Sequence, residues 1–188
     1  MADASAARQR LIEIVKARSL HAGTAIKLAS GRSSTFYVNL KPTMLDPEGA
    51  HLIATLILDA LQGATVDLVG GMEMGAVPLA STVAVTSHTR GRPLRAFFVR
   101  KQAKDHGTKN LVEGLAPGET LRGKRVVMLE DVTTTGGSTM KAIEALKAEG
   151  AIIERVITVV DRLEGAADAF KAAGVPFTAI LTAADFRT

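Results

Sequence analysis

Hydroxyl side chains and glycines follow a pair of acids, after one valine, in residues 126–138, which read VVMLEDVTTTGGS. An amphipathic helix with Met140, Ile143 and Leu146 inward is predicted just downstream, and the N-terminus of a helix binds anions through its unpaired N–H groups. Gly136 and Gly137 would let the backbone approach a phosphate closely and take positive φ. The hydroxyl donors are Thr133, Thr134, Thr135 and Ser138. We call residues 133–138 the hydroxyl loop and predict that it binds phosphate.

The acid pair, Glu130 and Asp131, does not suit a bare phosphate. Carboxylates accept hydrogen bonds from hydroxyl groups, so an acid pair beside a phosphate site indicates a ligand with neighbouring hydroxyls, such as ribose. The spacing differs from the Walker loop and from the dinucleotide motif G-x-G-x-x-G. A capped polar turn between a strand and a helix is the alternative interpretation. The full order of apolar run, two acids, hydroxyls and Gly-Gly favours a site for a sugar phosphate.

A second group of charged side chains lies in residues 100–107, RKQAKDHG, which we call the basic loop. Like charges at this density repel one another, so a mobile loop is predicted. Such a loop would neutralise an anionic leaving group and exclude water from it. Lys104 or His106 would be placed to donate a proton to that group. A solvated basic surface loop is the alternative interpretation.

The elements that must position these residues follow from hydrophobic periodicity. A helix is predicted over residues 5–18, a β-hairpin over 24–40, and a helix that begins after Asp46 and ends before Gly63. Four apolar runs then alternate with helical segments at 76–87, 136–149 and 164–173: VDLVGG, LRAFFV, KRVVMLE and ERVITVVD. This alternation is typical of an α/β fold with a central, mainly parallel sheet flanked by helices. Because ligands bind at the carboxyl ends of such strands, residues 70–76, 100–110, 130–138 and 161–165 should line one site.

Composition narrows the class of protein further. A chain of 188 residues is long enough for one domain with a full core, and we expect a single domain over residues 1–188. The formal charge of +4 suits an anionic partner, whereas 4% aromatic residues leave little for stacking on single-stranded bases, so no nucleic-acid partner is expected. There is no cysteine, no apolar run long enough to span a membrane, no secretory signal pattern and no metal-ligand spacing of His, Asp and Glu. We expect a cytoplasmic protein with no membrane partner and no metal held by its own side chains.

The acid pair and the hydroxyl loop resemble the phosphoribosyl diphosphate (PRPP) loop of the type I phosphoribosyltransferases. The resemblance implies that family's fold, with a small N-terminal hood formed mainly by residues 1–45. It implies that Glu130 and Asp131 face the ribose hydroxyls, and that Val132 and the hydroxyl loop wrap the 5-phosphate. Lys27 would contact PRPP from the hood, replacing a lysine that some members carry where this chain has Ala29.

The string RKQAKDHG resembles the catalytic loop of the orotate phosphoribosyltransferases, whose pattern is Arg-Lys-x-x-Lys-x-His-Gly. This resemblance implies transfer of phosphoribose from PRPP to orotate in pyrimidine (UMP) biosynthesis, with Mg²⁺ as cofactor. The ion would be held by PRPP and water more than by protein side chains. It also implies a homodimer whose active-site loop is shared between subunits. Arg100, Lys101, Lys104 and His106 would contact the diphosphate.

Residues for the orotate base follow from the same resemblance. Phe36 and Tyr37 would cover the base from the hood, Arg162 would meet the orotate carboxylate, and Thr134 would bond the base from the other side. An ion pair of Arg162 with Asp161 or Glu164 is the alternative. The chain also departs from some members at Met74, where they carry a lysine.

Two other functions remain open from the residues. One is a type I phosphoribosyltransferase for another base, which would keep residues 130–138 but would not need Arg162 or the basic loop. The other is a non-enzymatic PRPP-sensing regulator, which would keep the fold and the PRPP loop without an intact catalytic loop. Base turnover separates the three.

Overall fold

The computed structural model describes residues 4–27, 33–102 and 111–187, and it describes side chains outside 22–36. The strands are β1 (Leu20–Lys27), β2 (Ser33–Val38), β3 (Leu68–Met72), β4 (Arg95–Val99), β5 (Val112–Glu113), β6 (Arg125–Thr133), β7 (Ile152–Asp161) and β8 (Phe177–Thr182). The helices are α1 (Ala4–Arg18), α2 (Lys41–Met44), α3 (Pro47–Ala60), α4 (Ala76–Thr89), α5 (Gly137–Ala148), α6 (Ala166–Ala172) and the 3-10 helix η1 (Ala183–Phe186).

Six strands form the central sheet in the order β5-β4-β3-β6-β7-β8. All neighbours are parallel except β5, which runs antiparallel to β4. The predicted mainly parallel sheet flanked by helices is confirmed. The two-residue strand β5 and the strand β8 were not predicted, because neither has a long apolar run of its own.

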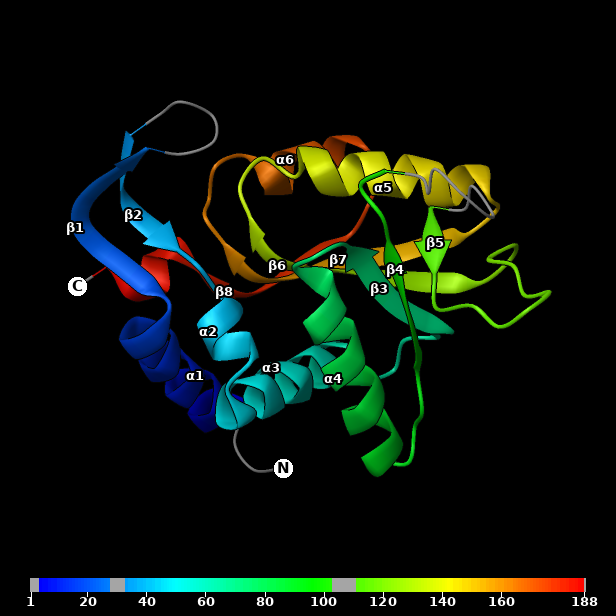
Figure 1. The fold of residues 1–188 in the computed structure, drawn as a ribbon, viewed down its shortest axis with the longest axis horizontal. Coiled ribbons are helices and arrows are strands. Elements are labelled where there is room, and N and C mark those ends of the chain that lie inside the picture. Colours follow the sequence, from blue (N-terminus) through cyan, green and yellow to red (C-terminus); the bar gives the residue numbers. More distant parts are fainter. Residues whose placement is uncertain (1–3, 28–32, 103–110, 188) are drawn as a thin grey trace.

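Helices cover both faces of the sheet, with α5 and α6 on one face and α1, α3 and α4 on the other (Figure 1). Each face has its own core, and β6 contributes to both because alternate strand residues point in opposite directions. Val126 and Met128 belong to the core beneath α5, whereas Val127 and Leu129 belong to the core beneath α3 and α4. This alternation decides where the acids that follow on β6 must point.

The predicted start of the helix after Asp46 and the predicted helix over residues 5–18 are both present. Asp46 is the N-cap of α3, accepting a hydrogen bond of 3.0 Å from the backbone N–H of Gly49, and Pro47 begins the helix. The amphipathic helix predicted over residues 5–18 is α1, which buries Leu11 and Val15 completely. Within the described ranges, no helix combines the length and apolar character needed to cross a bilayer.

The predicted hairpin is present as the antiparallel pair β1 and β2, which stands to one side of the main sheet (Figure 1). Its first strand starts at Leu20, earlier than predicted, so His21 lies within the hairpin and not before it. Residues 28–32, including Ala29, lie outside the described residues.

Candidate active site

The hydroxyl loop surrounds a small cavity at the N-terminus of α5. The cavity measures about 190 Å³ and is lined by Glu130, Val132, Thr133, Thr134, Thr135, Gly136, Gly137, Ser138 and Thr139. Gly136 is the N-cap of α5 and has no side chain to cap it, so the first N–H groups of the helix are left to an anion. Backbone N–H and hydroxyl donors therefore surround a cavity whose size suits a phosphate group.

The two glycines of the loop have different roles. Gly136 has φ +78°, and a Cβ there would lie 2.8 Å from the Phe170 ring, so both backbone and space require glycine. Gly137 is the first residue of α5 and is not among the glycines with positive φ. The prediction of positive φ is therefore right for Gly136 and wrong for Gly137, whose place in the helix fixes an ordinary helical backbone.

The acid pair belongs to strand β6, which continues to Thr133, whereas the apolar run in the sequence placed the end of the strand at Glu130. Because strand neighbours point to opposite faces, the two carboxylates separate. Glu130 is 8% exposed and accepts a hydrogen bond of 2.6 Å from the hydroxyl of Thr139 on α5. Asp131 points to the other face, where a Cβ on Gly75 at the start of α4 would lie 2.5 Å from its Oδ1.

The electrostatic environment of Glu130 is dominated by its burial. Burial raises the pKa of Glu130 from its ordinary value of 4.5 to about 7, and the neighbouring Asp131 carboxylate raises it as well. The Thr139 hydrogen bond and the Lys101 ammonium act in the opposite direction and lower this pKa. Glu130 therefore changes charge near neutral pH, at the wall of the cavity.

Strand β7 ends beside the hydroxyl loop. The backbone N–H of Arg162 donates to the Thr133 carbonyl at 2.9 Å, and the Thr133 and Thr158 hydroxyls share a buried hydrogen bond of 2.9 Å. The Arg162 side chain is 6% exposed and forms an ion pair of 2.8 Å with Glu164. The structure thus brings Arg162 to the predicted site and also contains the ion pair that was its alternative.

The basic loop begins at the end of β4, on the same edge of the sheet. Glu73, just past β3, accepts a hydrogen bond of 2.9 Å from the backbone N–H of Lys101, and Arg100 lies 3.9 Å from Glu113 of β5. Pairing of β4 with β5 closes the base of the loop. Lys104 and His106 lie outside the described residues.

Predicted base-binding residues of the hairpin are described only in part. Tyr37 is half-buried, and its ring centroid lies 6.0 Å from that of His21 on the paired strand. The side chains of Lys27 and Phe36 lie outside the described part of the structure. Met74 is 65% exposed in the turn between β3 and α4.

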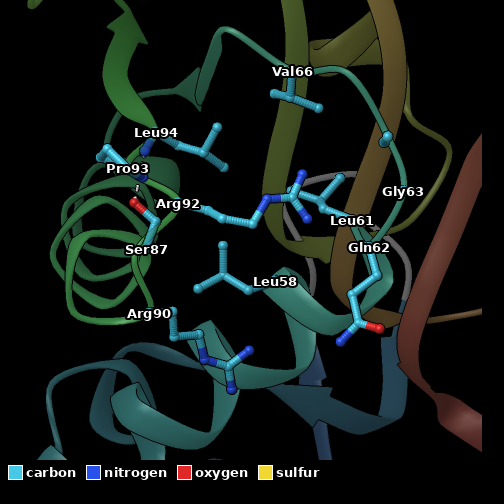
Figure 2. Close-up of a pocket in the computed structure, with 11 residues that line it drawn as sticks. Leu58, Leu61, Gln62, Gly63, Val66, Ser87, Arg90, Arg92, Pro93 and Leu94 are labelled. Carbon is cyan, nitrogen blue, oxygen red and sulfur yellow. Dashed lines mark hydrogen bonds between the residues drawn. The ribbon is translucent and has the colours of Figure 1, made fainter.

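A larger cavity, of about 690 Å³, lies away from these residues, between the ends of α3 and α4 and the start of β4 (Figure 2). Its lining includes Leu58, Leu61 and Val66, with Arg92 reaching in between them. It is at the edge of the sheet where the parallel strands begin, whereas ligands of such sheets bind where the strands end. The smaller, polar cavity is therefore the candidate active site.

Three side-chain or backbone contacts of this site were missed from the sequence: Thr139 with Glu130, Glu73 with Lys101, and Gly75 with Asp131. Thr139 directly follows the hydroxyl loop, so alternation along β6 combined with a helix starting at Gly137 would have pointed to it. Glu73 and Gly75 lie within residues 70–76, which were expected to line the site, but nothing local to them indicates Lys101 or Asp131 as a partner.

Comparison with known proteins agrees with this fold. Residues 43–179 match the family described as phosphoribosyl transferase domain. The chain is 57% identical over 182 residues to the orotate phosphoribosyltransferase of Bradyrhizobium diazoefficiens, covering 97% of each chain. Crystal structures of Mycobacterium tuberculosis orotate phosphoribosyltransferase are also similar. The complex with Fe(III) dicitrate has a TM-score of 0.83 at 37% identity, covering 97% of this chain and 99% of that one. The PRPP complex has a TM-score of 0.78 at 35% identity, covering 95% and 98%.

The fold and the cavity at the N-terminus of α5 define a phosphoribosyltransferase of type I architecture. The chain belongs to the orotate phosphoribosyltransferase family.

Proposed function

We propose that this protein transfers the 5-phosphoribosyl group of PRPP to orotate, forming orotidine 5-phosphate and diphosphate in pyrimidine biosynthesis. The observation that carries the proposal is the hydroxyl-lined cavity at the N-terminus of α5, with a buried carboxylate in its wall. The identity of 57% to a protein named orotate phosphoribosyltransferase supports orotate as the base.

PRPP would bind along the end of β6. The N–H groups and hydroxyls of residues 133–138 would hold the 5-phosphate, with Val132 also lining the cavity. Glu130 and Asp131 would accept hydrogen bonds from the ribose hydroxyls from opposite sides, because they point to opposite faces of the strand. Lys27 would reach PRPP from the hairpin, which would act as a hood over the site.

Orotate would bind between β7 and the hood. The Arg162 guanidinium would form a charge-assisted pair with the orotate carboxylate, shared with or released from Glu164. Thr134 would bond the base from the hydroxyl loop, and Phe36 and Tyr37 would cover the ring. The hydrogen bond from the Arg162 N–H to the Thr133 carbonyl supports this arrangement, since it joins the proposed base and phosphate sites.

The basic loop would act on the diphosphate. Arg100, Lys101, Lys104 and His106 would neutralise its charge and exclude water, with the loop shared between the subunits of a homodimer. Glu73 would anchor the loop through its bond to the Lys101 N–H. The hydroxyl and carboxylate oxygens that line the cavity are compatible with a ligand that carries Mg²⁺. Because Glu130 and Asp131 point to opposite faces of β6, they would not chelate one ion together, and PRPP oxygens and water would hold it. When bound, Mg²⁺ would neutralise part of the diphosphate charge.

In the reaction itself, N1 of orotate would form a bond to C1 of ribose as the C1–O bond to diphosphate breaks, with inversion at C1. The diphosphate would leave with the bonding electrons, and the N1 proton would pass to solvent. An oxocarbenium-like transition state is expected, as in glycoside chemistry. The protein would contribute alignment of the two substrates and neutralisation of the leaving group. We place this reaction in the cytoplasm, with no nucleic-acid or membrane partner.

The test is an ultraviolet absorbance assay with PRPP and Mg²⁺, offering orotate, uracil, hypoxanthine and adenine separately. We expect loss of the orotate signal with release of diphosphate, and a loss of roughly 100-fold in kcat for Lys104→Ala, since one stabilising donor contributes that much. Lys147→Ala, which removes the same charge from the far end of α5, is the matched control. Turnover of another base would overturn orotate as substrate, and PRPP binding without turnover of any base would point to a PRPP-sensing regulator.

A further inference from the structure

Thr139 is a buried hydroxyl in the wall of the candidate active site that the predicted set of ligand-binding residues did not include. It lies in the first turn of α5, is 1% exposed, and lines the same cavity as the hydroxyl loop. Unlike Thr135 and Ser138, which are exposed, it is turned inward toward β6. Its partner there is the carboxylate of Glu130.

The geometry of this contact is that of a strong hydrogen bond. Thr139 Oγ1 donates to Glu130 Oε1 at 2.6 Å, within the short range of about 2.5–2.7 Å found when a hydroxyl donates to a charged carboxylate. Both side chains are buried, which limits competition from water for the bond. With Oε1 occupied by Thr139, Oε2 is the oxygen left to accept a hydrogen bond from a ligand.

The groups that act on the charge of Glu130 come from several elements. Burial is the largest, and it disfavours the carboxylate; Asp131, the next residue of β6, also disfavours it. Thr139 of α5 and Lys101, at the end of β4, favour the charged form. Of these two, Thr139 is in direct contact with the carboxylate.

We propose that Thr139 is a positioning residue that fixes the Glu130 carboxylate in the wall of the cavity and keeps it ionised for the ribose hydroxyls of PRPP. This role rests on the proposed function, in which Glu130 accepts from ribose. A protonated Glu130 would have lost one acceptor, and an unfixed one would rotate out of line with the ligand. A purely structural threonine would affect stability without affecting the pH at which Glu130 ionises.

The first measurement is the pKa of Glu130 in the ligand-free protein, by carbon-13 NMR of labelled glutamate carboxyls, with Glu130→Gln used to assign the signal. We expect Thr139→Val, which keeps the shape and removes the donor, to raise this pKa by about one pH unit, the effect of losing one charge-assisted hydrogen bond. Thr139→Ser keeps the donor and should restore the original value. Thr139→Ala is a second donor-free variant in case valine packs poorly.

The matched control is Thr43→Val. Thr43 is also fully buried and also shares a 2.6 Å hydrogen bond, with Ser19, but it lies on α2 away from the cavity. This variant should lose stability and leave the Glu130 titration unchanged. A Glu130 pKa that moves equally in Thr43→Val and Thr139→Val would overturn the proposal.

The second measurement is kcat/KM for PRPP as a function of pH, which reports ionisations of the free enzyme. In Thr139→Val the rising limb should move to higher pH by the same amount as the NMR titration, and activity should recover toward wild type above that limb. A uniform loss at every pH, or an unchanged Glu130 pKa in an active enzyme, would show a structural threonine and overturn the role of Thr139 alone. Absence of transfer from PRPP to orotate by the wild type would instead overturn the proposed function.

Discussion

The two faces of strand β6 treat adjacent carboxylates differently. Glu130 lies on the face covered by α5, buried against Thr139 in the wall of the hydroxyl-lined cavity. Asp131 lies on the face covered by α4, beside the backbone of Gly75 and not in the lining of that cavity. Two acids that look equivalent in the sequence therefore point to opposite faces of β6 and differ in burial.

Because of this difference, separate features of the structure determine the state of each of the two acids. Burial pushes the pKa of Glu130 to about 7, so its charge depends on a hydrogen-bond donor from α5. The position of Asp131 depends instead on the absence of a side chain at Gly75. The charge of Glu130 is thus set by its electrostatic environment, whereas the position of Asp131 is set by the room that Gly75 leaves.

The largest expected effect is on activity when either acid is neutralised. Glu130→Gln and Asp131→Asn should each lower kcat/KM for PRPP roughly 100-fold, since each removes a charged group that we propose accepts from a ribose hydroxyl. Their pH dependence should differ. A carboxylate is ionised above its pKa, so wild-type activity should rise through about pH 7 as Glu130 ionises.

That rise should persist in Asp131→Asn and vanish in Glu130→Gln, which has no charge to gain. Steady-state kinetics between pH 5.5 and 9, roughly one to two units either side of the midpoint, would detect it. Glu144→Gln, on the exposed side of α5, is the matched control and should behave as wild type. The same pH profile in both acid variants would show that Glu130 is not the group that titrates.

Much of this comparison could be predicted from the sequence, because its main parts are contiguous. The apolar run, acid pair, hydroxyls and glycines of residues 126–138 lie in one strand-to-helix unit, so their order alone points to the polar cavity at the start of α5. The buried parallel strands were visible as apolar runs, and Asp46 and Pro47 marked the start of α3. Local chemistry and hydrophobic periodicity were sufficient for these parts.

Other parts depend on contacts between distant segments. The apolar run in the sequence placed the end of β6 at Glu130, yet pairing with β7 carries the strand to Thr133. Opposite faces for the two acids follow only from that extension. The Glu73 bond to the Lys101 N–H and the approach of Gly75 to Asp131 join separate strand ends, and short spacing in sequence does not encode them.

A second expected difference concerns stability. The raised pKa of Glu130 means that the folded state holds a proton that the unfolded state has released, so its stabilising contribution is present below pH 4.5 and is lost as pH rises through about 7. Glu130→Gln has no such loss, and its amide oxygen can still accept from Thr139. At pH 8 it should therefore be more stable than wild type by about 2 kcal/mol, as an order of magnitude from the shifted pKa.

Urea denaturation at pH 5 and pH 8 would measure this difference in free energy of unfolding. The gap between Glu130→Gln and wild type should be small at pH 5 and open at pH 8, with Glu144→Gln as the baseline. An equal gap at both pH values would mean that the variant changes packing and not the charge on the α5 face of β6. An inactive but more stable Glu130→Gln would show that the buried charge is retained for function.

The smallest expected effect tests the α4 face through Gly75→Ala. The backbone of Gly75 is helical, with φ −59° and ψ −42°, so alanine fits the chain, but its Cβ would lie 2.5 Å from Oδ1 and 2.6 Å from Cγ of Asp131. Asp131 must rotate away, and we expect kcat/KM for PRPP to fall about tenfold, equivalent to about 1.4 kcal/mol. A double-mutant cycle with Asp131→Ala distinguishes this cause from general damage. If the loss comes from displacing the carboxylate, Gly75→Ala should add little once the carboxylate is gone. If the losses in kcat/KM of the two single variants add fully, Gly75→Ala affects activity by another route, and the idea that Gly75 makes room for the Asp131 carboxylate is refuted.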